Sequence, residues 1–448
     1  MLRSRSILRL FLSLVALVLF TFLVFYWPGH PYRRIKNIRN AETEVFRDKD
    51  KILPTFDQHF TNCAVDTIDT KREPAQKHLS KLFAVWHDQK HIISTVRRGE
   101  EKINILFWTE FHQKRLETEL LPKGRRQLCP HMPGCTFSRY HEDIEDADAV
   151  FFENSNLPLV FNSTMMPKVR YPRQHWIWFN PECPNFPSIN FDSYKSVFNW
   201  TITYRGDSDS TSTYGSLYKI YKRLSGEYID RNRNYAARKT KLVVWFISKC
   251  NSQANRIAYA TELIKYIDVD VFGGCGKSVC EKWNVTCMPG IIEKYKFYLA
   301  FENNKCKEYI TEKFWRNALG NNAVPVVLGA NRSDFQRLAP PNSYIHVDDF
   351  KSPKELADYL KLLNKDSNRY NQYFKWKTNP PQNIPFDGGI WCNLCRGLLQ
   401  TSPTRRKVYT DLKTWFEGEN LSNCDPIENV TYQNLEFVGK WFRVVPDG

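Results

Sequence analysis

The stretch YKFYLAFENNKCKEYITEKFWRNALGNNAVPVVLGA, residues 295–330, decides the fold of this chain. It begins with an apolar run, 297–301, that is typical of a buried strand. A polar turn follows, and apolar residues from Ile310 to Leu319 then recur at helical spacing. A glycine and two asparagines end the predicted helix, and 323–328 predicts a second strand. Strand, helix and strand within about 30 residues form a βαβ unit, the building block of a parallel sheet.

One edge of this predicted unit suits a ligand. Parallel sheets bind ligands outside the carboxyl ends of their strands, beside the N-termini of helices. The first turn of a helix offers free N–H groups and the positive end of its dipole, and a lysine there adds a cation. The residues at this edge are Asn303, Tyr309, Thr311, Glu312 and Lys313. We therefore expect the edge to bind a diphosphate.

The ordered segments FEN (301–303), YITEK (309–313) and VPVVLG (324–329) resemble the donor-binding signature of the α1,3-fucosyltransferases. These are inverting glycosyltransferases that use GDP-fucose. The resemblance implies GDP-fucose as the donor substrate and a GlcNAc hydroxyl of a glycoprotein or other glycan as the acceptor, joined in α1,3 linkage. It also implies a donor-site role for the residues at matching positions, namely Ser248, Arg256, Tyr298, Asn303, Tyr309, Glu312 and Lys313.

Two of these residues are cations that suit a departing diphosphate. Lys313 lies in the first turn of its predicted helix, and Arg256 lies on the helix that follows the strand 242–247. We expect Glu312 to accept hydrogen bonds from nucleoside or fucose hydroxyls, because a carboxylate repels a diphosphate. For Tyr298, a position in the core is the alternative to a contact with the ligand.

The candidate general base is Glu182. Inverting sugar transfer needs a base on the acceptor hydroxyl, and in inverting glycosidases that base is a carboxylate. The segment WFNPECP (178–184), followed by FNWTITYRGDSD (198–209), matches the family segments around its catalytic Glu, which implies that Glu182 deprotonates the acceptor. Cys183 stands where many relatives carry Ser. The alternative is that Glu182 is an ordinary exposed loop carboxylate.

Asp207-Ser-Asp209 has the D-x-D form of a metal–nucleotide motif found in another glycosyltransferase architecture. It lies far in sequence from the predicted donor unit. We favour a structural role, in which the two carboxylates shape a loop or pair with Arg205. In the family this segment recurs in enzymes that do not rely on such a metal site. We therefore expect no obligatory cofactor and a divalent metal that is at most stimulatory.

The chain is too long for one core, so we expect two domains with appendages. Apolar strands are predicted at 103–108, 147–152 and 175–179 in a first α/β unit, and at 241–248 and 268–272 in a second. The resemblance implies a GT-B-like fold, with two Rossmann-like domains facing each other across a cleft. We place the acceptor-side domain at 99–235, the GDP-fucose-binding domain at 236–399, and a tail that packs back on the first domain at 400–448.

A membrane anchor is predicted at residues 10–27, where 18 consecutive residues carry no charge. Three arginines precede it, which favours a cytoplasmic tail at 1–9. A cleaved signal peptide is the alternative, but the run is long and no small-residue cleavage site follows. We expect a single-pass type II Golgi membrane protein with a stem at 28–98 and a luminal catalytic part.

Six N-x-[ST] sequons and twelve cysteines favour an oxidising, glycosylating compartment. Cys392 and Cys395 have zinc-ligand spacing, but no second pair lies at the expected distance, so disulfides are favoured. The family resemblance implies the local bridges Cys129–Cys135 and Cys392–Cys395. The pairing of the other cysteines stays open. The sequons are at Asn162, Asn199, Asn284, Asn331, Asn420 and Asn429.

The net charge of +16 suits an anionic membrane, a phosphorylated substrate or nucleic acid. No nucleic-acid-binding motif is present, so the first two partners are favoured. Two alternatives to a fucosyltransferase stay open: a catalytically inactive glycan-binding relative, and a transferase of the same architecture that uses another nucleotide sugar. The acceptor is also open between the core GlcNAc of an N-glycan and an outer LacNAc arm.

Overall fold

The computed structural model describes residues 102–111, 121, 124–129, 132, 134–162, 164–184, 189–227, 229–249, 256–280, 286–401, 407–425, 435–438 and 441–444. All of them belong to one unit, Ala64–Gly448. The predicted cytoplasmic tail, anchor and stem lie outside the described residues. Among the residues that are described, no helix is both long and apolar enough to cross a membrane.

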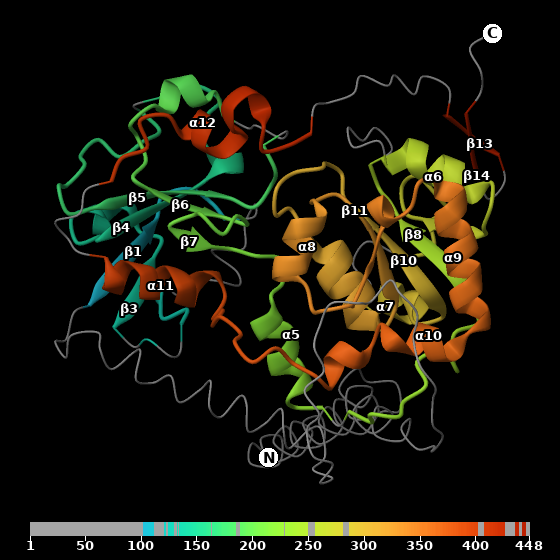
Figure 1. Cartoon of the computed structure of the whole chain (residues 1–448). Helices are drawn as coiled ribbons and strands as arrows, with labels where there is room; N and C mark the ends of the chain where they lie inside the picture. The colour runs from blue at the N-terminus through green and yellow to red at the C-terminus, as the bar shows by residue number, and fades with distance from the viewer. Residues whose placement is uncertain are drawn as a thin grey trace, which may run out of the picture. The chain divides into compact units, whose positions relative to one another are not determined.

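The first sheet has the strand order β2-β3-β1-β4-β5-β6-β7 (Figure 1). All neighbouring strands are parallel except β2 and β3, which run antiparallel. Its central strands are buried along nearly their whole length, as expected for a parallel sheet that is covered on both faces. The strands are β1 (Ile103–Phe107), β2 (Arg125–Arg126), β3 (Cys135–Ser138), β4 (Ala149–Glu153), β5 (His175–Asn180), β6 (Trp200–Thr203) and β7 (Ser210–Thr211). The three strands predicted for this unit are thus confirmed.

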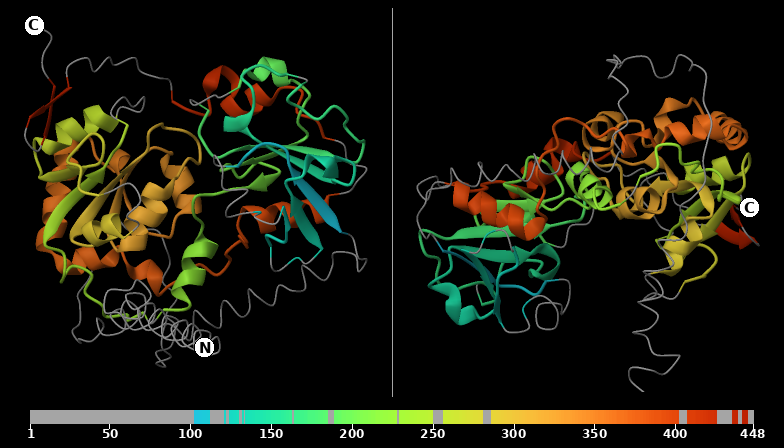
Figure 2. Two further views of the ribbon diagram at one scale, coloured as in Figure 1. Left: turned by 180° about the vertical axis from the view of Figure 1, so that it is seen from behind. Right: turned by 90° about the horizontal axis from the view of Figure 1, so that it is seen from below.

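Helices from the C-terminal part of the chain cover both faces of the first sheet (Figures 1 and 2). α11 (Ile390–Gln400) packs with Ile105 and Phe107, whereas α12 (Leu412–Glu417) packs with Leu106. These positions alternate along β1, so the two helices lie on opposite faces. The domain boundaries expected from the sequence place residues 390–399 in the second domain. In the structure, however, α11 packs on the first sheet. Short 3₁₀ helices at His141–Ile144, Asn154–Asn156, Phe191–Tyr194 and Glu419–Leu421 complete this part.

The second sheet is all parallel, with the order β12-β11-β10-β8-β9. Its strands are β8 (Lys241–Phe246), β9 (Val269–Phe272), β10 (Tyr295–Phe301), β11 (Val324–Leu328) and β12 (Ile345–His346). The central strand is β10, and each of its seven residues is buried. The helices of this part are α5 (Leu217–Leu224), α6 (Arg256–Ile264), α7 (Cys287–Ile292), α8 (Arg332–Leu338), α9 (Pro353–Lys365) and α10 (Ser367–Gln372), with 3₁₀ turns at Val347–Asp349 and Lys375–Lys377. A two-stranded antiparallel sheet, β13 (Leu435–Val438) and β14 (Trp441–Val444), follows.

The helix predicted between β10 and β11 has a different form in the structure. Lys313–Ala318 is a π-helix, η6, and a 3₁₀ turn, η7 (Leu319–Asn321), follows it. Four of the six π-helical residues are buried, so the segment is packed inside the protein along most of its length. Asn321 stabilises the wide turn, because its Nδ2 donates to the carbonyls of Arg316 and Asn317. Single π-helical turns of this kind are frequent at functional sites.

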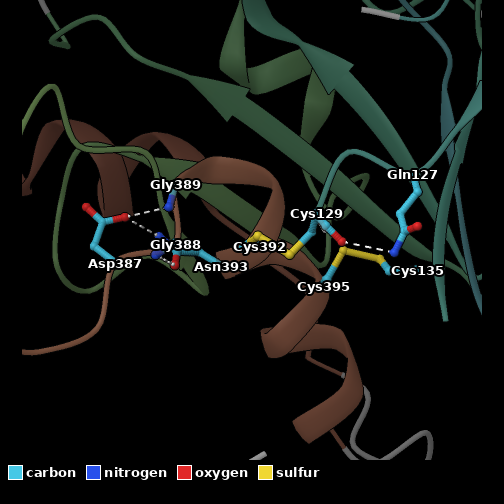
Figure 3. Close-up of a disulfide and its surroundings, with 9 residues drawn as sticks. All are labelled: Gln127, Cys129, Cys135, Asp387, Gly388, Gly389, Cys392, Asn393 and Cys395. Atoms are coloured by element: carbon cyan, nitrogen blue, oxygen red, sulfur yellow. Dashed lines mark hydrogen bonds between the residues drawn. A yellow bond between two sulfur atoms is a disulfide. The ribbon is translucent and has the colours of Figure 1, made fainter. Parts of the chain in front are cut away.

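Two disulfides join α11 to the first sheet (Figure 3). They are Cys129–Cys392 and Cys135–Cys395, which correct the local bridges that the family resemblance implied. The cysteines of α11 are three residues apart and therefore share one helix face, and that face lies on the sheet beside the other two. Each bond closes about 260 residues of chain, with separations of 263 and 260. Cys280–Cys287 and Cys306–Cys424 are two further disulfides.

Candidate active site

The ends of two strands, one from each sheet, meet through a hydrogen bond. Glu182 follows β5, and Tyr309 lies in the loop after β10. The Tyr309 hydroxyl donates to Glu182 Oε2 at 2.9 Å. Glu182 is exposed, whereas Tyr309 is buried with its ring packed edge-on against Tyr204 and Tyr214. The structure therefore brings the predicted base to the predicted donor edge and leaves it accessible.

The short segment that carries Glu182 is held from two sides. The Asn180 side chain accepts from the Glu182 N–H at 3.0 Å, a local turn that fixes the loop. The Tyr214 hydroxyl donates to the Pro181 carbonyl at 3.0 Å. Asn180 is 2% exposed, and its Nδ2 has no partner among the described residues. Neither Asn180 nor Tyr214 was predicted. An Asn before a Pro at a strand end was the available signal for the first, and no sequence signal marked the second.

Lys313 carries three hydrogen bonds at the start of the π-helix. Its Nζ donates to Glu302 at 3.0 Å, to Thr311 Oγ1 at 2.9 Å and to Glu312 at 3.2 Å. An ammonium group has three N–H donors, so each is used inside the protein. Although burial lowers it, the charges of Glu302 and Glu312 raise the pKa of Lys313, and the side chain is a cation at any physiological pH.

Glu302 is a site residue that sequence reasoning missed. It follows β10 directly, is 1% exposed, and accepts from both the N–H and the hydroxyl of Thr311. Burial raises the pKa of Glu302, and the nearby Lys313 charge opposes that shift. A carboxylate placed directly after a run of seven buried residues was the available signal, because such a group needs a partner. That partner is Lys313.

Glu312 is the second carboxylate on Lys313, and it differs from Glu302 in exposure. Its side chain is 35% exposed, compared with 2% for Glu302. Burial raises the pKa of Glu312, but the charge of Lys313 and its hydrogen bond outweigh this, so the net shift is downward. Lys313 is thus paired with one buried carboxylate and with one that an arriving ligand can reach.

Arg256 and Ser248 lie at the neighbouring strand end, after β8. Arg256 is 3% exposed at the start of α6, and its guanidinium donates to the Lys249 carbonyl at 2.9 Å and to the Phe301 carbonyl at 3.2 Å. Burial lowers the pKa of Arg256 to about 10, so it stays charged at neutral pH. Its Nε is buried without a partner among the described residues. Ser248 is exposed two residues beyond β8.

The last two predicted donor-site residues lie at different depths. Asn303 is partly exposed beyond the end of β10. Tyr298 is fully buried in the middle of β10, where its hydroxyl accepts from Asn317 Nδ2 at 3.2 Å. Burial raises the pKa of Tyr298 to about 12. The structure therefore gives Tyr298 a place in the core, where it supports the π-helix from beneath.

The Asp207-Ser-Asp209 segment has the structural role expected of it. Asp207 pairs with Arg205, whose guanidinium also donates to the carbonyls of two tail residues, Trp415 and Phe416. Asp209 accepts from the Tyr409 hydroxyl at 2.7 Å and from a lysine of the tail. The segment thus fastens the C-terminal tail to the first sheet. Within the described residues, no group of three or more His, Cys, Asp or Glu side chains could hold a metal ion.

The loop between β10 and η6 is also fastened to the first sheet and the tail. Glu308 accepts from the Gly206 N–H and pairs with Arg337 of α8. Cys306 forms a disulfide with Cys424 of the tail. The loop that carries Asn303 and Tyr309 is therefore tied at several points to the part of the chain that carries Glu182.

Comparison with known proteins identifies the family. Residues 236–415 match the model of the glycosyltransferase family 10 (fucosyltransferase) C-terminal domain, and residues 100–215 match the fucosyltransferase N-terminal domain. The family matches define the class of protein, a glycosyltransferase. Its first sheet carries Glu182 at a strand end, and its second sheet carries Lys313 with its carboxylate partners. The chain belongs to glycosyltransferase family 10, the fucosyltransferases.

Several curated fucosyltransferases are similar to the chain. Glycoprotein 3-α-L-fucosyltransferase A of Drosophila melanogaster is 38% identical over 306 residues, 67% of this chain and 58% of that protein. A 3-galactosyl-N-acetylglucosaminide 4-α-L-fucosyltransferase of Pan troglodytes is 37% identical over 318 residues, 70% of this chain and 80% of that protein. A crystal structure of an α1,3-fucosyltransferase aligns with a TM-score of 0.45 and 17% identity, over 67% of this chain and 91% of that one.

Proposed function

We propose that this chain is an inverting α1,3-fucosyltransferase that moves fucose from GDP-fucose to a GlcNAc hydroxyl of a glycan. The observation that carries the proposal is the 2.9 Å hydrogen bond between Glu182 and Tyr309, because it joins an accessible carboxylate to the edge that holds Lys313. The names of the relatives support fucose as the sugar, since each is a fucosyltransferase.

Glu182 is the general base of the proposed reaction. It takes the proton of the acceptor hydroxyl while the acceptor oxygen attacks C1 of fucose. The new bond from oxygen to C1 forms as the bond from C1 to the phosphate oxygen breaks, and attack from the opposite face inverts the configuration at C1. The electron pair of the broken bond leaves with GDP, and the proton remains on Glu182. Its exposed side chain can pass that proton on to water.

The departing diphosphate is stabilised by two cations from the second sheet, Lys313 and Arg256. Preorganised cations at the position where charge develops stabilise a transition state more than the ground state. Glu302 fixes the Lys313 amine, and its burial keeps that contact away from water. Neutralisation by these side chains replaces a general acid, and we propose that a divalent metal is not obligatory.

We infer that the two parallel sheets form a GT-B-like pair of domains. We also propose that residues 10–27 hold the protein in the Golgi membrane, with the catalytic part in the lumen. Disulfides persist in such an oxidising compartment, and four are formed between described cysteines. The six sequons support the same location.

A panel of labelled GDP- and UDP-sugars tests the donor. We expect transfer from GDP-fucose, and turnover of a UDP-sugar instead would contradict the proposal. The acceptor is tested on an array that carries both an N-glycan core GlcNAc and outer LacNAc arms, followed by linkage analysis. The relatives named above divide between glycoprotein and galactosyl-GlcNAc acceptors, so both belong on the array.

The base is tested with Glu182→Gln, which keeps the shape of the side chain but cannot accept a proton. We expect transfer to fall about 10²- to 10⁴-fold while GDP still binds. The matched control is Glu145→Gln, an exposed carboxylate away from the site. Normal turnover by the Glu182 variant would refute the assignment, and glycan binding without any turnover in the wild type would identify an inactive relative.

A further inference from the structure

A cavity lies outside the candidate active site, between α5 and the segment that leads into α11. Its volume is about 380 Å³, within the range of small-ligand sites. Tyr218, Lys219, Lys222 and Arg223 line it from α5, and Phe386 to Gly389 line it from the other side. None of these residues belongs to the predicted donor site or contacts Glu182 in the described structure.

The cavity carries an excess of positive charge. Lys219, Lys222 and Arg223 are spaced i, i+3 and i+4 along α5, so they share one helix face. Asp387 is the one carboxylate among the lining residues, and Lys219 pairs with it at 3.1 Å. Arg223 has a long contact, 3.8 Å, with Glu227 outside the cavity. Lys222 and Arg223 are exposed, so they can meet an anion from solution.

Asp387 lines the cavity, but its carboxylate is engaged by neighbouring groups of the protein, and Figure 3 shows its bonds to Gly389 and Asn393. Its carboxylate accepts from the Gly389 N–H at 2.9 Å, from Asn393 Nδ2 at 3.0 Å and from the Thr213 hydroxyl at 3.2 Å, besides Lys219. These bonds fix the Gly388–Gly389 wall of the cavity. Because these bonds already engage its oxygens, Asp387 is poorly placed to accept hydrogen bonds from a ligand such as a nucleotide base.

Two lysines outside the cavity lining, Lys377 and Lys239, have lowered pKa values. Behind α5, burial followed by the charges of Arg233 and Arg223 lowers the pKa of Lys377 to about 7. Burial likewise lowers the pKa of Lys239 to about 8, although the charge of Glu293 opposes the shift. Burial is the main cause of both shifts, and a nearby anion would favour the charged form of each lysine.

One wall of the cavity is aromatic and open. Phe386 is partly exposed and packs edge-to-face with Tyr218 at 4.9 Å between ring centroids. Arg396 lies over the Phe386 ring but does not line the cavity. Gly389 has φ +82, and a Cβ built there meets no atom within 4 Å, so the cavity is open at this residue. A Cβ at Gly388 would instead meet Phe386 and Cys392. An apolar ring face beside cations suits the carbon face of a sugar that also carries a negative group.

We propose that this cavity binds an acidic sugar, a glycan unit that carries sulfate or carboxylate, at a place separate from the transfer site. Lys222 and Arg223 hold the anionic group, and the guanidinium can bind it through two parallel hydrogen bonds. Phe386 contacts the sugar ring, and Gly389 leaves room for the ring to approach. The site does not depend on the donor or on the transfer reaction.

Titration calorimetry on the full chain, with a sulfated heparin-derived disaccharide as the probe, tests the proposal. We expect saturable binding to the wild type, and at least about tenfold weaker binding to the double variant Lys222→Glu/Arg223→Glu. The matched control is Lys361→Glu/Lys365→Glu, which makes the same charge change on exposed positions of α9. The control variant should bind within about twofold of the wild type.

Three results would overturn the proposal. The first is the absence of binding to the wild type. The second is an equal loss of affinity in both double variants, which would identify unspecific attraction to a polyanion. The third is full competition by GDP, which would place the probe in a nucleotide site. Phe386→Ala gives an independent check, because it should weaken the sulfated probe several-fold without any change of charge. Turnover of a neutral acceptor should stay unchanged in every variant, so a failure here is separate from a failure of the transferase proposal.

Discussion

The Tyr309 hydroxyl donates to Glu182 Oε2 at 2.9 Å across 127 residues of sequence. Tyr309 belongs to the loop after β10, beside Lys313, whereas Glu182 belongs to the segment after β5 of the other sheet. The bond therefore links the position of the proposed base to the loop that we propose binds the donor. A change in the conformation of that loop, with or without a bound donor, would reach Glu182 through the Tyr309 hydroxyl.

Tyr309→Phe isolates that hydroxyl. The phenyl ring keeps its packing against Tyr204 and Tyr214, so we expect the fold to be retained. The base loses its fixed orientation, and we expect kcat to fall about tenfold while GDP affinity changes by less than about threefold. Kinetics with separate GDP titration distinguish the two effects. Tyr359→Phe, a remote hydroxyl paired with Tyr373, is the matched control. A Tyr309→Phe enzyme with wild-type kcat would show that the bond does not position the base.

The two carboxylates on Lys313 should respond differently to the same substitution. Glu312→Gln removes the accessible carboxylate that we expect to accept from the donor's hydroxyl groups, so we expect the nucleotide to bind several-fold more weakly. Glu302→Gln leaves a largely buried ammonium without its main partner, and we expect a loss of stability on the order of 3 kcal/mol. GDP titration and denaturant unfolding measure the two outcomes. Tighter GDP binding in Glu312→Gln would mean that Glu312 competes with the diphosphate for Lys313 and does not support the donor.

Much of the fold could be predicted because parallel strands that are buried on both faces have continuous apolar runs in their sequence. The runs at 103–108, 175–179 and 297–301 each proved to be a strand, since both faces of the two sheets are covered. The donor edge followed from the same logic, because a polar turn between two such strands must lie at their carboxyl ends. Lys313, Tyr309 and Asn303 were thus placed at the strand end without knowledge of any distance.

What could not be predicted depends on contacts between distant segments. A helical pattern does not distinguish an α-helix from the π-helix at Lys313–Ala318, because the wide turn is held by side-chain bonds such as those from Asn321. The bridges of Cys392 and Cys395 were misassigned because nothing local shows that their helix lies on the first sheet. Glu302 was overlooked for the same reason, since its role exists only through Thr311 and Lys313.

Lys377 should make the stability of the protein depend on pH. Its buried amine donates to Asn322 Oδ1 and lies over the Tyr235 ring, yet burial lowers its pKa from 10.5 to about 7. Between these two values the unfolded chain holds one proton more than the folded chain, so raising the pH favours folding. Denaturant unfolding at pH 6 and pH 9 should show a gain with pH in the wild type that is smaller in Lys377→Met. The exposed Lys361→Met should keep the wild-type gain, and an identical pH dependence in both variants would contradict the shift.

The Cys306–Cys424 disulfide ties the loop after β10 to the C-terminal tail across 118 residues of sequence, whereas Cys280–Cys287 spans only 7. A cross-link that closes a long loop restricts the unfolded chain more than one that closes a short loop. We therefore expect Cys306→Ser/Cys424→Ser to lose about 2–4 kcal/mol of stability and Cys280→Ser/Cys287→Ser to lose less. Because the first loop also carries Asn303 and Tyr309, that variant alone should bind GDP several-fold more weakly. Thermal unfolding and GDP titration of both variants check this, and unchanged GDP affinity in the first would show that Glu308 and the tail hold the loop without the bond.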